Sequence, residues 1–95
     1  MNGTMQMDTS AAQTVKTEIL DTVEAMRNRW MLFNRRVDEF TSTDWKSRSS
    51  SQFFDIFREL VELENIRLDE LNQLASKLDM EIAAWENTNI SGSAL

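Results

Sequence analysis

The side chains that could carry out chemistry in this 95-residue chain are carboxylates, hydroxyls and a group of arginines. The sequence contains neither His nor Cys, which excludes imidazole bases, thiol nucleophiles, disulfides and the usual zinc ligands. The hydroxyls of the run SRSSS have no base within any recognisable motif. Carboxylates such as Glu59, Glu62, Asp69 and Glu70 have the spacing of salt bridges along helices. We therefore predict no catalytic site, no metal site and no cofactor, and expect a protein that is not an enzyme.

The cations gather in one stretch of the chain, residues 27–48. They are Arg27, Arg29, Arg35, Arg36, Lys46 and Arg48. Acidic residues in the same stretch halve this charge, and the whole chain carries a net charge of −6, which repels phosphate. No apolar run approaches the roughly 18 residues of a membrane span. We expect neither nucleic-acid binding nor stable membrane insertion.

The chain is short enough for a single domain, residues 1–95. Proline is absent, and Gly3 and Gly92 are the only glycines, so nothing between them interrupts a helix. The N-terminal residues MNGTMQMDTSAAQT lack the basic and apolar regions of a secretory signal peptide. We expect a protein made in the cytoplasm, whose export would use a route without a cleavable signal peptide.

Two apolar stripes recur at steps of three and four residues, which predicts two amphipathic helices. The first stripe comprises Val15, Ile19, Val23, Met26, Trp30, Phe33, Val37 and Phe40. The second comprises Phe54, Phe57, Val61, Glu64, Leu68, Leu71, Ala75, Leu78, Ile82 and Trp85. The pair Ser49 and Gln52 has the spacing of a capping box at the start of the second helix.

These patterns predict an all-α fold in which two helices form an antiparallel hairpin. We place helix 1 at about residues 9–40, the turn at 41–49, helix 2 at about 50–87, and flexible tails at 1–8 and 88–95. The segment FFDIFRELVEL has apolar residues over a wider arc than one partner helix can cover, which favours dimerisation into a four-helix bundle. The expected packing and dimer residues are Ile19, Val23, Met26, Trp30, Phe33, Val37, Phe40, Phe53, Phe54, Phe57, Leu60, Val61, Leu68, Leu71, Leu78 and Ile82.

The charge distribution predicts the orientation of the two hairpins in this dimer. Residues 1–26 carry Lys16 against four acidic residues, for a net charge of −3, and residues 49–95 carry a net charge of −6. Residues 27–48, nearest the turn, carry a net charge of +3. An antiparallel arrangement would set the basic turn of one hairpin beside the acidic open end of the other.

The predicted turn contains Trp45-Lys46-Ser47, and the second helix opens with Phe53, Phe54 and Phe57. With the later spacing of leucines, this pattern resembles the WXG (Trp-x-Gly) family of early-secreted-antigen-like substrates of bacterial type VII secretion. The resemblance covers roughly residues 12–90. It implies a helical hairpin that pairs antiparallel, as a homodimer or as a heterodimer with a related hairpin protein. It also implies recognition by a secretion ATPase and localisation first in the cytoplasm and then outside the cell.

The sequence departs from the pattern of that family at two places. Ser47 stands where the family has Gly, which would cost about 1 kcal/mol if the site needed a positive φ. The family's export signal, Tyr-x-x-x-Asp/Glu, has as its nearest match Trp85-x-x-x-Asn89. The resemblance implies that Trp45 of one chain and Trp85 to Asn89 of the other form one surface for the secretion machinery.

Three alternatives remain open from the sequence. Trp45 either closes the end of the hairpin or is recognised by a partner, and the two roles are compatible. Glu64 either lies at the edge of its stripe with its carboxylate in water, or pairs with Arg27 to fix the alignment of the helices. The alternative to secretion is a cytoplasmic adaptor or secretion chaperone that holds a partner helix on the face from Phe53 to Leu63.

Overall fold

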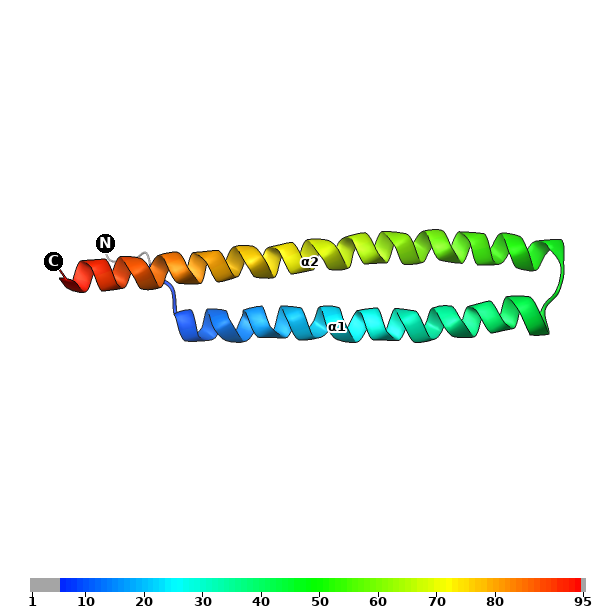
Figure 1. Cartoon of the computed structure of the whole chain (residues 1–95), viewed down its shortest axis with the longest axis horizontal. Helices are drawn as coiled ribbons and strands as arrows, with labels where there is room; N and C mark the ends of the chain where they lie inside the picture. Colours follow the sequence, from blue (N-terminus) through cyan, green and yellow to red (C-terminus); the bar gives the residue numbers. More distant parts are fainter. Residues whose placement is uncertain (1–5, 95) are drawn as a thin grey trace.

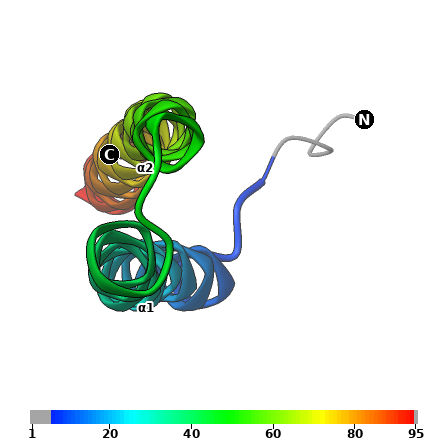
Figure 2. The same ribbon diagram turned by 90° about the vertical axis from the view of Figure 1, so that its right-hand side faces the viewer.

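The fold is a single antiparallel pair of helices, which confirms the predicted all-α hairpin (Figure 1). The structure is a computed structural model that describes residues 6–94, with side chains through residue 87. Helix α1 spans Thr9–Glu39, a π-helical turn η1 spans Phe40–Asp44, and helix α2 spans Arg48–Ala94. The molecule measures 72 × 18 × 17 Å along its principal axes. In the end-on view of Figure 2, α1 and α2 lie side by side.

Helix α1 begins at a side-chain cap and ends in a widened turn. The Asp8 carboxylate accepts a hydrogen bond of 3.0 Å from the backbone N–H of Ala11, which satisfies one free donor of the first turn. At the other end, the N–H of Trp45 donates to the carbonyl of Phe40 at 2.8 Å, five residues back, as in a π-helix. The buried Thr41 hydroxyl donates to the Val37 carbonyl at 2.9 Å, so this polar group keeps a hydrogen-bond partner although it is buried.

Helix α1 agrees with the predicted residues 9–40, whereas the connection is shorter and α2 longer than the sequence pattern predicts. Only Trp45, Lys46 and Ser47 separate η1 from α2, in place of the predicted turn at 41–49. Helix α2 also continues past the predicted end near residue 87, to Ala94. Polar residues in that segment suggested an earlier end, but none is proline, so every N–H can join the helical hydrogen bonds, and Gly92 alone costs about 1 kcal/mol.

The buried core is a narrow line between the two helices. Its apolar members are Val23, Val37, Phe57, Leu68, Ala75 and Ile82. The four from α2 recur at intervals of 11, 7 and 7 residues, which are close to whole numbers of helical turns and keep them on the side that faces α1. Two helices can bury only the residues directly between them, so the residues that flank this line remain accessible within one chain.

Two general features of the described residues bear on function. No helix among them is long and apolar enough to cross a membrane. The described part of the chain also brings together no group of three His, Cys, Asp or Glu residues that could hold a metal ion.

Candidate interaction surface

The two long sides of the hairpin differ in chemistry, and cross-helix contacts identify one of them as polar. Lys16 of α1 pairs with Asp79 of α2 at 2.8 Å. Arg27 pairs with Asp69 and also donates a 3.4 Å hydrogen bond to Asn65. Helical residues advance by about 100° each, so these α2 residues all lie on the same side of the buried line. We call the side that bears these ion pairs the polar face.

The opposite side exposes large apolar side chains, and we call it the apolar face. Its exposed members are Val15 and Phe33 from α1, Phe40 from η1, and Phe53, Ile56, Leu60, Leu63, Leu71 and Leu74 from α2. The same 100° step displaces them from the buried line in the direction away from the ion pairs. Half-buried Ile19, Met26 and Leu78 border them. Exposed apolar side chains gathered along one side of a hairpin are typical of a protein–protein interface.

Aromatic rings cover the turn end of the apolar face. The Trp45 ring lies 5.8 Å from that of Phe40 and 5.6 Å from that of Phe53, and so contacts both sides of the connection. Further along, Phe33 meets Phe57 edge-on at 5.3 Å. Trp45 is half-buried by its contacts, so it does close the end of the hairpin while part of its surface stays accessible.

The start of α2 differs from the predicted capping box. Ser47, immediately before the helix, accepts a hydrogen bond at its Oγ from the N–H of Ser50 at 3.2 Å, and its own N–H donates to the Ser50 Oγ at 3.0 Å. The box is therefore Ser47 with Ser50, not Ser49 with Gln52, both of which are exposed. A serine at the cap satisfies the free donors of the first turn of a helix.

This cap also explains the residue that stands in place of the expected glycine. No non-glycine residue among those described has a positive φ, so Ser47 carries no backbone strain. The cost of about 1 kcal/mol that a positive φ at Ser47 would impose therefore does not arise. A glycine at this position would have no side chain to accept the hydrogen bond from Ser50.

Glu64 does not pair with Arg27, so the alternative in which this ion pair fixes the alignment of the helices is wrong. It is half-buried and accepts a 2.9 Å hydrogen bond from Arg67, three residues ahead on the same helix. Arg27 has its partners on the polar face, at Asp69 and Asn65. The cross-helix pairs that align α1 with α2 were not identified from the sequence, because their residues lie outside the apolar stripes.

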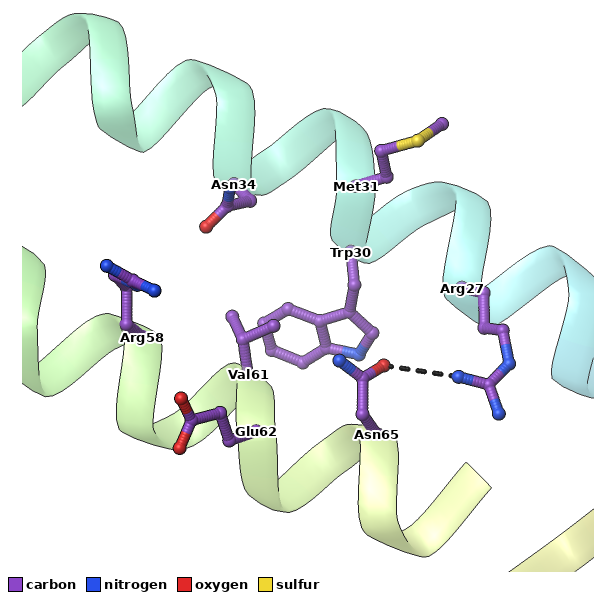
Figure 3. Close-up of a pocket in the computed structure, with 8 residues that line it drawn as sticks. All are labelled: Arg27, Trp30, Met31, Asn34, Arg58, Val61, Glu62 and Asn65. Carbon is purple, nitrogen blue, oxygen red and sulfur yellow. Dashed lines mark hydrogen bonds between the residues drawn. The ribbon is translucent and has the colours of Figure 1, made fainter. Parts of the chain in front are cut away.

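A shallow pocket of about 350 Å³ lies on the polar face between the helices (Figure 3). The Trp30 indole extends toward α2, and Arg27 and Asn65 meet at one side of it. The pocket is lined by Arg27, Trp30, Met31, Asn34, Arg58, Val61, Glu62 and Asn65. Guanidinium and amide groups of this kind suit hydrogen bonding to a ligand or partner rather than the making and breaking of bonds.

The structure divides the predicted packing residues into three groups. Val23, Val37, Phe57, Leu68 and Ile82 are buried within one chain; Ile19, Met26, Trp30, Phe54, Val61 and Leu78 are half-buried; Phe33, Phe40, Phe53, Leu60 and Leu71 are exposed. Trp85 is half-buried on α2, while the side chain of Asn89 lies outside the described residues. The exposed group belongs to the apolar face, and an interface formed there would cover it.

Comparisons of the chain with family models, with curated proteins and with solved structures returned no match. The resemblance to the WXG family therefore remains a prediction that rests on the pattern of residues and on the hairpin.

Proposed function

We propose that the protein is a non-enzymatic, WXG-like substrate or co-substrate of a type VII secretion system, and that it acts as a helical dimer. The observation that carries the proposal is the position of Trp45. It lies in the three-residue connection of a hairpin, half-buried between Phe40 and Phe53. An indole held by rings on two sides is rigid, and a rigid, partly accessible aromatic residue is a typical anchor for recognition by another protein.

The apolar face supports the dimeric part of the proposal. Exposed Phe33, Phe40 and Phe53 adjoin exposed leucines along α2, and a second hairpin placed on this face would bury them. The resulting four-helix bundle has the architecture that the resemblance implies. Pairing with a related chain that carries a complete export signal would also compensate for the Trp85-x-x-x-Asn89 sequence, which lacks the Tyr and the acid.

The test is export of the protein from its natural host. Culture supernatants are compared with a cytoplasmic lysis marker for the wild type, Trp45→Phe, Trp45→Ala and Met80→Ala. Trp45→Phe keeps an aromatic ring between Phe40 and Phe53 but removes the indole N–H and part of its surface. Met80 is 71% exposed on α2, away from the apolar face, and serves as the matched control for an exposed substitution.

We expect the wild type and Met80→Ala outside the cell, and both Trp45 variants retained while their circular dichroism remains helical. Export also stops when the secretion ATPase of the host is deleted. Normal export of Trp45→Phe would limit Trp45 to packing and overturn its role in recognition. Wild-type protein that stays with the lysis marker in the presence of an active secretion system would overturn the secretion proposal.

The second candidate is a cytoplasmic adaptor or secretion chaperone. The observation that favours it is the exposed row Phe53, Ile56, Leu60 and Leu63 on the first half of α2, whose spacing matches a surface that binds an amphipathic helix. Under this alternative, the protein remains inside the cell and binds a partner of different sequence through this row. The export assay therefore separates the two candidates directly.

A further inference from the structure

The accessible stripe along α2 has a symmetry that one hairpin does not require. Seven apolar residues of the apolar face and one charged residue form this α2 stripe: Phe53, Ile56, Leu60, Leu63, Arg67, Leu71, Leu74 and Leu78. Apolar residues lie 4, 7 and 11 positions before Arg67 and again 4, 7 and 11 positions after it. Over residues 56–78 the spacing is thus the same in both directions along the chain, whereas Phe53, 14 positions before Arg67, has Glu81 as its counterpart.

The apolar residues that α1 contributes to the apolar face are centred at the same height along the hairpin as Arg67. Arg27 contacts both Asn65 and Asp69, the two residues that bracket Arg67 on α2. Met26, the neighbour of Arg27, is half-buried, and Ile19 and Phe33 lie seven positions to either side of it. The two stripes of the apolar face are therefore centred on one cross-section of the hairpin.

We propose that the apolar face binds a second copy of this chain, antiparallel, about a two-fold axis that crosses α2 at Arg67. In such a pair, a residue a given number of positions before Arg67 meets the residue the same number after it on the partner. Leu63 then faces the partner's Leu71, Leu60 faces the partner's Leu74, and α1 lies against the partner's α1. A different partner chain would place no symmetry requirement on this sequence, so the symmetric spacing favours a homodimer.

The position of the axis follows from Arg67, the charged residue within the α2 stripe. Moving the axis by half a heptad in either direction sets this guanidinium against the partner's Leu60 or the partner's Leu74, which would place a charge against hydrocarbon. At the proposed axis every leucine faces an apolar residue instead. Each Arg67 is held by its own Glu64 at 2.9 Å, which neutralises the two cations where they approach each other.

The charges of the two halves of the hairpin favour the antiparallel orientation. The half toward the turn, residues 27–67, carries eight cations and seven anions, a net charge of +1. The open half carries Lys16 and Lys77 against nine anions, a net charge of −7. A turn-to-turn dimer would set −7 beside −7, whereas the antiparallel dimer sets −7 beside +1.

The inference rests on the dimer of the proposed function and names its partner. It is tested by cysteine cross-linking of the full chain, which contains no native Cys. Single-cysteine variants Arg67→Cys, Ile56→Cys, Leu78→Cys and Ile66→Cys are purified and oxidised at micromolar concentration, alone and in mixtures, and separated on non-reducing gels. Ile66 is the matched control because it is exposed on the side of α2 directed away from α1, 100° around the helix from Arg67.

We expect Arg67→Cys to cross-link to itself, and Ile56→Cys to cross-link with Leu78→Cys at least tenfold more than with itself. Ile66→Cys gives no dimer above background. A turn-to-turn pair sets every residue opposite its own copy, so efficient self-linking of Ile56→Cys would overturn the inference. A wild-type chain that sediments as a monomer at 100 times the protein concentration used for cross-linking would overturn it as well.

Cross-linking and export give separate results for the two proposals. The expected cross-links with no export would leave the homodimer standing and remove the secretion role. Export without the Arg67→Cys cross-link would leave the secretion role standing and overturn the proposed two-fold axis.

Discussion

Truncating Leu60 to Ala should weaken dimerisation, whereas the same truncation at Ile66 should not. The two side chains are 51% and 55% exposed within one hairpin, so the folded single chain treats them almost equally. They differ in position, because Leu60 lies on the apolar face and Ile66 on the side of α2 that is directed away from α1. A difference in dimerisation between the two variants therefore shows that a partner covers the apolar face.

The size of the effect follows from the exposed fraction of Leu60. Leu→Ala removes three carbons, each worth about 0.8 kcal/mol when fully buried. Because Leu60 is 51% exposed in one hairpin, dimerisation would bury about half of this surface and contribute about 1.2 kcal/mol per chain. The dimer contains two copies of the site, so the loss is about 2.4 kcal/mol, equivalent to roughly a 50-fold increase in Kd.

The assay is sedimentation equilibrium of the wild type, Leu60→Ala and Ile66→Ala over a wide range of concentration. We expect Kd to rise about 50-fold for Leu60→Ala and less than threefold for Ile66→Ala, with both chains fully helical by circular dichroism. Equal changes in Kd for the two variants would refute the assignment of the apolar face as the interface. A value of Kd that neither substitution alters would refute it too.

Three further predictions concern the turn and the polar face. Ser47→Ala should lower the free energy of unfolding by about 1 kcal/mol, because it removes the hydroxyl that accepts a hydrogen bond from the N–H of Ser50. Urea unfolding measures this loss, and Ser47→Gly should show a smaller one. Trp45→Ala should lower it by about 2 kcal/mol through the loss of two ring pairs, and Trp45→Phe should restore most of it in the same assay. Arg27→Ala should change it by less than about 1 kcal/mol, with a wild-type contribution that declines in high salt, because its pair with Asp69 is exposed.

The sequence was sufficient to predict the hairpin because the apolar stripes recur at steps of three and four without a proline. Every apolar residue that the structure buries belongs to one of the two predicted stripes. The repeat of apolar residues is a property of helices that must pack on each other, and it does not depend on distant details of the chain.

The ends of the helices and the alignment between them could not be predicted in the same way. Ser47 and Ser49 are equally plausible caps by type, and only the path of the chain after Trp45 selects Ser47. The pairs from Lys16 to Asp79 and from Arg27 to Asp69 join residues 63 and 42 positions apart, and many other acids offered similar partners. Burial of the apolar stripes determines which acid lies within reach, so these contacts follow from the packing and do not precede it.

The aromatic contacts at the turn have a consequence for the order in which the chain folds. Trp45 links Phe40 with Phe53, which lie only 13 positions apart, whereas Lys16 meets Asp79 across 63 positions. The entropy lost in closing a loop grows with its length, so contacts around Trp45 form at lower cost than those at the open end. Pairing of the helices then spreads from the turn outward, and each new contact extends a loop that is already closed. A topology dominated by such local steps folds rapidly, and the rate of folding should fall more on loss of Trp45 than on loss of Lys16.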